Sequence, residues 1–187
     1  MELGLQISDR PDAALVREAK SGQPEAFNVL VRRWERKVYS FLVYLTGRPE
    51  DAFDMCQEAF LSAYRHLGQL KEADKFPQWL FRIARNTAHS HARREREEET
   101  SVGDLEATEH SSTVRVGEAG QWERGDLRIL VEKALAGLPL EQREAIVLKF
   151  YQGFKLAEIA EIQGCPLSTA KTRVYSGFEQ LRKLIER

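Results

Sequence analysis

The sequence predicts an all-α protein made of two small helical bundles joined by a flexible linker, with a helix-turn-helix in the C-terminal bundle. Apolar residues recur three or four positions apart over most of the 187 residues, and no segment has the alternation and β-branched bias of a strand. Residues 97–125, in contrast, are rich in Glu, Ser, Thr and Gly and lack a sustained apolar period. This linker therefore separates an N-terminal domain, residues 1–96, from a C-terminal domain, residues 126–187.

The N-terminal domain is expected to form a bundle of three long helices. The first begins near Pro24 and ends at Gly47, the second runs from about Pro49 to Leu67, and the third opens at Pro77 after a polar loop. A short helix over residues 12–20 packs across them. The residues predicted to point inward are Phe27, Leu30, Val31, Trp34, Val38, Phe41, Leu42, Leu45, Ala52, Met55, Cys56, Ala59, Phe60, Ala63, Leu80, Phe81, Ala84 and Ala88.

The C-terminal domain is expected to hold four helices. The first starts at Leu127 and stops at Gly137, and the second spans Pro139 to Phe150, with Ile146, Val147 and Phe150 inward. The last two helices form the helix-turn-helix. The four helices together are enough for a compact DNA-binding module, although such a domain is only marginally stable alone.

The helix-turn-helix is the most informative feature of the chain. A short amphipathic helix, Leu156 to Gln163, is followed by Gly164, which suits a left-handed helix stop, and then by Pro166 and a second helix. The second helix of such a pair offers its N-terminal side chains to the major groove. Here these are hydroxyl and basic residues, which hold phosphates and reach base edges: Ser168, Thr169, Lys171, Thr172 and Arg173. The expected ligand is duplex DNA.

The charge is unevenly distributed along the chain. The formal net charge is −1, but the sequence gives +3 for residues 1–96, −6 for residues 97–125 and +2 for residues 126–187. Two mildly basic domains therefore flank an acidic linker. No apolar run is long enough to span a membrane and the start lacks the pattern of an export signal, so we expect a cytoplasmic protein without membrane insertion.

No chemistry-bearing motif points to an enzyme. The two cysteines, Cys56 and Cys165, lie far apart, without a CxxC pair or a Cys-His cluster, so no metal site is expected and both thiols are interpreted as small apolar side chains. Gly-rich phosphate loops, serine-nucleophile elbows and zincin patterns are absent from the sequence. We therefore predict no catalytic residues and no cofactor.

The third helix of the N-terminal domain carries a second candidate DNA-binding surface. Its residues outside the apolar stripe form a predicted basic ridge suited to a phosphate backbone: Arg82, Arg85, Asn86, His89, Arg93 and Arg94. Before it, Phe76 and Trp79 lie near Lys71, Asp74 and Lys75, a combination suited to holding an unpaired base. Other interpretations remain open: Trp79 and Phe76 could be core residues, and the arginines could form an intrahelical charge ladder with the following glutamates.

The second helix carries a polar strip with Asp54, Gln57, Glu58 and Arg65. Carboxylates at this spacing could suggest acid-base chemistry, but no nucleophile or metal ligand accompanies them. The strip is either a protein-docking face or ordinary solvated surface, and the residues by themselves favour the latter.

Four segments together resemble the extracytoplasmic-function (ECF) sigma factors of bacterial RNA polymerase. Residues 49–60 are similar to the family's stretch ending in Asp-x-x-Gln-Glu-x-Phe, and residues 76–86 to its Phe-x-x-Trp-Leu-x-Arg-Ile-Ala-x-Asn signature. Residues 138–148 and 158–173 are similar to its C-terminal four-helix module. The resemblance covers nearly the whole chain outside the linker. It implies a sigma factor that binds polymerase core and directs initiation at promoters with minus-ten and minus-thirty-five elements.

The resemblance also implies roles for individual residues. The face that binds the clamp coiled coil of the polymerase β′ subunit would include Asp54, Gln57, Glu58 and Phe60, which reverses the preference for inert surface. Residues at or near the minus-ten element would be Lys71, Asp74, Phe76, Trp79, Arg82, Asn86, His89, Arg93 and Arg94. Residues at the minus-thirty-five element would be Lys155, Ser168, Thr169, Lys171, Thr172, Arg173 and Tyr175.

The implied partners are the polymerase core, through the β′ clamp coiled coil and the β flap, promoter DNA, and an anti-sigma protein wedged between the two domains. The linker would thread towards the polymerase active site. Departures from the family pattern include Ser90 in place of an Asp, Ser168 in place of a Gly, and Gly177-Phe178 in place of a small residue and an Arg. An alternative from the residues themselves is a two-domain transcriptional regulator with the same helix-turn-helix, which would not need the strip around Gln57.

Overall fold

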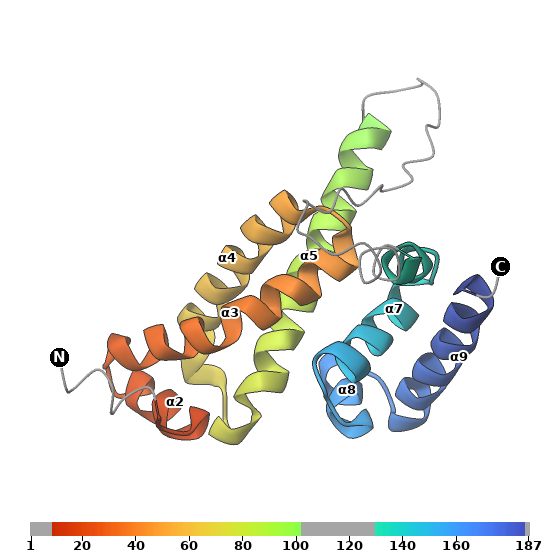
Figure 1. The fold of residues 1–187 in the computed structure, drawn as a ribbon. Helices are drawn as coiled ribbons and strands as arrows, with labels where there is room; N and C mark the ends of the chain where they lie inside the picture. The colour runs from red at the N-terminus through yellow and green to blue at the C-terminus, as the bar shows by residue number, and fades with distance from the viewer. Residues whose placement is uncertain (1–8, 102–129, 186–187) are drawn as a thin grey trace, which may run out of the picture.

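The computed structural model describes residues 9–101 and 130–185, and every regular element in these ranges is helical (Figure 1). The expected all-α class is confirmed, with two helical bundles and a C-terminal helix-turn-helix. Most of the predicted linker, residues 102–125, lies outside the described residues, as do Leu127 and the start of the helix predicted there.

The N-terminal bundle contains α2 (Asp12–Lys20), α3 (Pro24–Thr46), α4 (Pro49–His66) and α5 (Phe76–Ser101). Proline at the first position of α3 and α4 starts each helix, and α3 ends at Gly47 in the left-handed conformation with φ 70°. Single 3-10 turns, Leu67–Gln69 and Ala73–Lys75, connect α4 to α5. Helices α3, α4 and α5 pack against one another, and α2 crosses them.

The predicted core of this bundle is largely confirmed. All of its predicted inward residues are buried except Val31 and Trp34, which are partly buried against the same cluster. Trp34 is held at the edge because its indole Nε1 donates a 2.9 Å hydrogen bond to the Asp12 carboxylate, which also pairs with Arg33. This contact fixes α2 on α3.

The C-terminal bundle contains a short helix over residues 130–136, then α7 (Leu140–Ile146), α8 (Leu156–Gln163) and α9 (Leu167–Ile185). Helix α7 continues into a π-helical turn, Val147–Tyr151. The predicted turn of the helix-turn-helix is confirmed. Gly164 is left-handed with φ 63°, and the backbone N–H of Cys165 donates a hydrogen bond to the backbone oxygen of Ala160.

One detail of the helix predictions is wrong. Phe150 is not inward but 57% exposed, because the hydrogen bond from Gln152 N to Val147 O widens the last turn to the π form and rotates Phe150 out. Helix α5 extends to Ser101, past the predicted start of the linker at residue 97, and the i,i+4 pairs His91–Glu95 and Arg93–Glu97 lie along its last turns.

The two bundles are in direct contact. Helix α5 of the first lies against α8 of the second, and α3 touches α7 (Figure 1). The Phe81 and Phe154 rings meet edge to face with centroids 5.0 Å apart, and the Tyr44 and Tyr151 rings are 4.5 Å apart. One continuous apolar cluster therefore runs through both domains.

Candidate functional sites

The polar strip on α4 faces solvent as a docking surface requires. Asp54, Gln57 and Glu58 are exposed and border a shallow depression with Leu61 and Arg65. Phe60, predicted to belong to the same face, is buried at 8% exposure and points into the bundle. It supports the strip from below and contributes little surface of its own.

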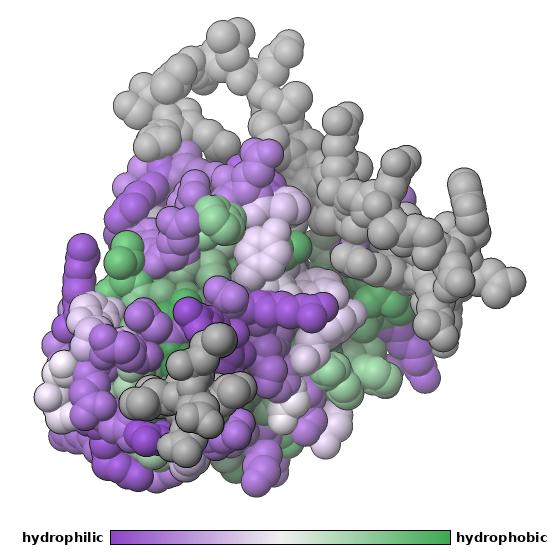
Figure 2. All heavy atoms as spheres, turned by 60° about the vertical axis from the view of Figure 1, so that its left-hand side comes forward, coloured by the Kyte–Doolittle hydropathy of each residue, from purple (hydrophilic) through white to green (hydrophobic). Residues whose placement is uncertain are grey.

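Beside this strip lies a groove of about 920 Å³ between α3 and α4. Large apolar side chains project at its α4 edge, with Phe53 56%, Leu61 55% and Tyr64 51% exposed. The N-terminal bundle comes forward in Figure 2, where hydrophobic patches interrupt a largely hydrophilic surface. Sequence reasoning missed this apolar edge, although the helical spacing of Phe53, Leu61 and Tyr64 places these three residues on the same side of α4. We call the surface formed by Phe53, Asp54, Gln57, Glu58, Leu61 and Tyr64 the α4 face.

The groove floor includes the thiol of Cys56. Burial, assisted by the nearby charge of Glu35, raises the pKa of Cys56 to about 11. The thiol therefore stays protonated, which agrees with its interpretation as a small apolar side chain.

Only some residues of the predicted base-binding loop are exposed to solvent. Lys71 and Asp74 are exposed and Trp79 is partly buried, next to a small depression also lined by Lys75 and Arg82. Phe76, in contrast, is 0% exposed. Of the two interpretations that the sequence leaves open for Phe76, the structure agrees with a core residue, because Phe76 begins α5 directly after a 3-10 turn and its ring enters the core. Its assignment to the minus-ten element stays a prediction.

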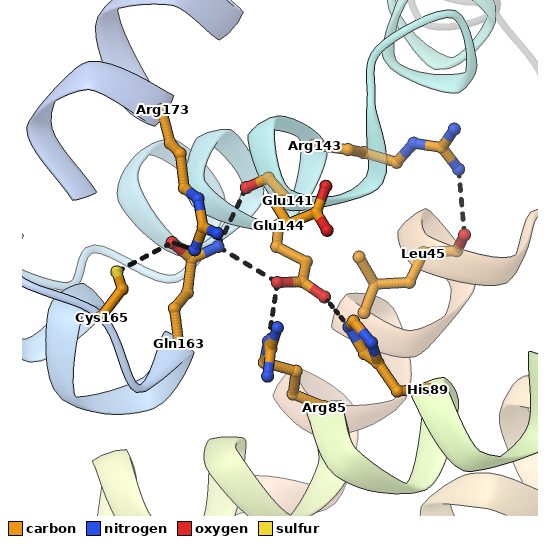
Figure 3. Close-up of polar contacts among 9 residues, drawn as sticks. All are labelled: Leu45, Arg85, His89, Glu141, Arg143, Glu144, Gln163, Cys165 and Arg173. Atoms are coloured by element: carbon orange, nitrogen blue, oxygen red, sulfur yellow. Dashed lines mark hydrogen bonds and ion pairs between the residues drawn. The ribbon is translucent and has the colours of Figure 1, made fainter. Parts of the chain in front are cut away.

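The basic ridge on α5 is divided between two faces. Arg82, Asn86, Arg93 and Arg94 are exposed as predicted. Arg85 and His89 are not: both turn towards the C-terminal domain and bind one carboxylate, that of Glu144 on α7 (Figure 3). The expectation that they line an exposed ridge is corrected here, because both side chains contact a buried carboxylate of the other domain.

Glu144 is the centre of this interdomain cluster. Its side chain is 0% exposed, its Oε2 lies 2.7 Å from Arg85 Nε and 3.1 Å from Gln163 Nε2, and its Oε1 bonds to His89 Nε2. Burial by itself raises the pKa of Glu144, but the hydrogen bond from His89 and the charge of Arg85 outweigh it, so the pKa lies below its usual value. Glu144 is therefore an ionised carboxylate sealed between the domains.

Further polar contacts surround this cluster. On the rim, Lys75 Nζ lies 3.3 Å from a Glu161 oxygen, and Gln78 Nε2 donates to Glu158 over 3.1 Å. On the opposite side, Arg143 donates to the backbone oxygen of Leu45 over 2.9 Å, and burial lowers the pKa of Arg143. Each contact joins a group of the first domain to one of the second.

Most of the predicted DNA-contacting residues near the N-terminus of α9 are exposed to solvent. Ser168, Lys171 and Thr172 are exposed, and Tyr175 is 66% exposed. Thr169 is partly buried, and Lys155, before α8, is exposed. Arg173 is partly buried because its guanidinium donates to Gln163 Oε1 over 3.2 Å, which ties it to the Glu144 cluster.

Comparison with protein families matches both domains. Residues 30–98 match the Sigma-70 region 2 model, and residues 128–181 match the Sigma-70 region 4 model. The chain is 34% identical over 181 residues to the ECF RNA polymerase sigma-E factor of Escherichia coli K12, covering 94% of each chain. It is 28% identical over 186 residues to the RNA polymerase sigma-H factor of Pseudomonas aeruginosa, covering 96% of each.

Solved structures show the same architecture. The sigma factor RpoE from Bartonella quintana, solved in complex with the anti-sigma factor NepR, superposes with a TM-score of 0.69 at 26% identity over 86% of this chain and 96% of that one. CnrH, solved with the cytosolic domain of CnrY, also gives 0.69 at 22% identity, over 94% and 97%, which supports the fold.

The fold and the matched regions define a sigma factor. The chain belongs to the ECF sigma factor family, whose members are transcription initiation factors. In the described part of the chain, none of the helices has the length and apolarity needed to cross a membrane.

Proposed function

We propose that this protein binds RNA polymerase core through the α4 face and directs initiation at promoters read by α5 and α9. The observation that supports the proposal is that one chain matching both sigma regions carries an exposed α4 face and two helices, α5 and α9, with exposed basic side chains. Each reader alone is weak, and mounting both on a polymerase makes their binding energies act together.

The α4 face suits a helical partner such as the β′ clamp coiled coil. The groove supplies an apolar centre through Phe53, Leu61 and Tyr64, and Gln57 with Glu58 supplies a polar edge. An amphipathic helix laid in a groove uses these two components together. The apolar edge adds the desolvated area that the polar strip alone lacks.

The minus-ten element is assigned to the exposed side of α5 and the loop before it. Arg82, Asn86, Arg93 and Arg94 are placed to follow a phosphate backbone, since they lie along one helix and face solvent. An extruded base would stack at the depression beside Trp79, where Lys71 can contact its phosphate. Because Phe76 is buried, it is not assigned a base contact.

The minus-thirty-five element is assigned to the start of α9. Lys171 and Thr172 face solvent next to Tyr175, and Ser168 lies at the N-terminal end, where a helix enters the major groove. Lys155 would contact the backbone from the N-terminus of α8. Thr169 is partly buried. Arg173 would reach DNA after its hydrogen bond to Gln163 is released.

Two further partners fit the same arrangement. The C-terminal domain would contact the β flap, and the acidic linker would follow the basic channel towards the polymerase active site. Regulation by an anti-sigma protein is supported by the two similar structures, RpoE with the anti-sigma factor NepR and CnrH with the cytosolic domain of CnrY. We propose that such a partner covers the α4 face or separates the two domains.

Transcription reconstituted from purified core tests the proposal. Core alone and core with this chain are given fragmented genomic DNA, and the start sites are mapped. We expect starts that cluster downstream of a shared two-part sequence when the chain is present. Starts scattered as with core alone would rule the sigma function out for this chain.

A second experiment tests the docking face. The double variant Gln57→Ala, Glu58→Ala should weaken core binding by about tenfold or more, because it removes the polar edge of the interface. The matched control Gln69→Ala, Glu72→Ala changes the same residue types at exposed positions off the α4 face. Binding is measured without DNA, and equal affinities for both variants would remove α4 from the interface.

A further inference from the structure

A pair of phenyl rings is exposed on the C-terminal domain, beside the first half of α9. Phe150 is 57% exposed and Phe178 is 47% exposed, and their ring centroids lie 5.9 Å apart with 34° between the ring planes. Tyr175, which is 66% exposed, stands three residues before Phe178. The function proposed for α9 uses Tyr175 but neither phenylalanine. Two large apolar rings side by side at the surface are typical of an interaction site.

Two features of the backbone bring these rings together. The π-helical turn Val147–Tyr151, in which Gln152 N donates to Val147 O, turns Phe150 away from the core. Such π turns within helices occur frequently at functional sites. Gly177 lets α9 approach α7 closely, since a Cβ at this position would lie 3.0 Å from Ile146 Cγ1. The close approach places the next residue, Phe178, beside Phe150, so the pair is a product of the domain's packing.

The second ring continues the side of α9 that is assigned to DNA. Lys171, Tyr175, Phe178 and Arg182 follow one another at intervals of four, three and four residues, which is the spacing of one stripe along a helix. All four residues are exposed. Lys149 directly precedes the other ring, so basic residues flank the pair on both elements. An apolar centre with a basic rim complements the major groove of DNA, where thymine methyl groups lie between two rows of phosphates.

We propose that Phe150 and Phe178 contact the 5-methyl group of a thymine in the minus-thirty-five element, and that this contact determines part of the promoter sequence that the chain selects. The inference rests on the proposed function of α9. Apolar contact with the thymine methyl group is a form of direct base readout, because no other base presents a methyl group in the major groove. A phenyl ring has no charge with which to hold phosphate, so the contact contributes sequence preference rather than general DNA affinity.

Continuity with the start of α9 favours DNA over a protein as the ligand of the rings. When Lys171 and Tyr175 face the major groove, a side chain one turn further along the same stripe lies beside the same groove. A protein seated on the two rings would compete with the duplex for this side of α9. The basic rim also matches the phosphates on either side of the groove.

Replacement of thymine by deoxyuracil tests the contact without a change in the protein. Deoxyuracil keeps the hydrogen-bonding groups of thymine and lacks its methyl group. Polymerase core carrying the full chain is bound to a promoter fragment taken from the mapped start sites, with thymine or deoxyuracil at each thymine position of the minus-thirty-five element in turn. At the contacted position we expect about fourfold weaker binding with deoxyuracil, the factor given by burial of one methyl-sized group.

Variants of the chain assign the methyl contact to the two rings. The double variant Phe150→Ala, Phe178→Ala should bind the thymine promoter about fourfold more weakly than the wild type and should not distinguish the two bases. Phe178→Arg should also reduce the base difference, but it should raise the salt dependence by about one phosphate contact. The matched control is Leu130→Ala, which removes an exposed apolar side chain of the same domain outside α9 and should keep the full base difference.

Several results would overturn the proposal. One is equal affinity of the wild type for both bases at every thymine. Another is a deoxyuracil effect that persists in the double variant, because a different residue would then contact the methyl group. If the double variant instead loses affinity for core without DNA, the rings belong to a protein interface. Start sites that share no sequence would remove the proposed function and this contact with it, whereas clustered start sites without a deoxyuracil effect would remove the contact alone.

Discussion

The α4 face and the Glu144-facing side of α5 belong to one bundle and differ in what covers them. The α4 face is open, with Phe53, Leu61 and Tyr64 more than half exposed. The α5 side is closed by the C-terminal domain, which buries Glu144 and holds Arg85. The proposed core-docking face is therefore accessible without any rearrangement of the chain, whereas Arg85 and His89 become accessible only if the two domains separate.

The physical basis of the difference is complementarity within the chain. The covered side combines an aromatic contact, Phe81 on Phe154, with a buried charge cluster, so both apolar and polar groups have partners. The open face leaves its apolar groups uncovered in the described part of the chain, which is typical of an interaction site. Substitutions on the covered side should therefore change the stability of the chain, whereas substitutions at matched exposed positions should change the binding of partners.

The largest contrast is expected between two phenylalanines. Phe154→Ala removes a buried ring from the interdomain contact and should lower the free energy of unfolding by about 3 kcal/mol. Phe53→Ala, at an exposed position, should change it by less than about 0.5 kcal/mol and instead weaken core binding. Urea unfolding and a core-binding assay on both variants measure this. Equal destabilisation would show that the two faces are not distinct.

Two arginines on α5 give the next largest contrast. Arg85→Ala removes the arginine partner of the buried Glu144 carboxylate and should destabilise the folded chain by about 2–3 kcal/mol. Arg82→Ala, one turn away on the exposed side, should have almost no effect on stability but should weaken DNA binding and lower its salt dependence. The reverse assignment, with Arg82 structural, would contradict the division of the ridge.

These contrasts coincide with the limits of sequence reasoning. The amphipathic period placed α3, α4 and the helix-turn-helix correctly, since each of these helices has a buried apolar stripe. It also placed Arg85 and His89 outside the apolar stripe, which was correct for their own domain. Their partner, Glu144, is 55 to 59 residues away. No local pattern reports such a contact, because a polar position on one helix looks the same whether it meets water or a buried carboxylate.

The positions of Phe150 and Phe76 have local causes that the apolar period of the sequence does not reveal. Phe150 is exposed because a π turn shifts the register by part of a residue, and the apolar pattern around it is unchanged. Phe76 appeared in a polar loop, where an aromatic residue can equally be core or ligand. Its burial depends on the 3-10 turn Ala73–Lys75, and the packing of the folded bundle, not the local sequence pattern, determines this turn.

The pH dependence of the closed state is expected to be smaller than the effect of Arg85→Ala. Because the pKa of Glu144 is lowered in the folded chain, its contribution is fully present above the usual value of 4.5 and is lost as the pH falls through the lowered value. Arg85 and His89 on α5, Gln163 on α8 and the nearby Arg143 surround it. Protonation leaves a neutral acid that still bonds to Gln163, so part of the contact survives.

Small-angle scattering between pH 7 and pH 3 measures this transition. The wild type should expand in the acid range before it unfolds, and E144Q, lacking the titrating group, should already be expanded at pH 7. A wild type that keeps its size until global unfolding would show that Glu144 ionisation does not hold the domains together.

The smallest effect is expected inside the C-terminal domain, away from both faces, at Gly177 of α9. An added Cβ there would lie 3.0 Å from Ile146 Cγ1 and 3.3 Å from Gln142 Cβ, both on α7. Alanine gains about 1 kcal/mol of helix propensity over glycine, but overpacking a close helix contact costs about 1–3 kcal/mol. We expect Gly177→Ala to lower the free energy of unfolding by about 0.5 kcal/mol, with Gly68→Ala, where no atom lies within 4 Å, as the neutral control. A clear gain in stability for Gly177→Ala would mean that α7 and α9 can move apart at no cost, and that this glycine is not required by their packing.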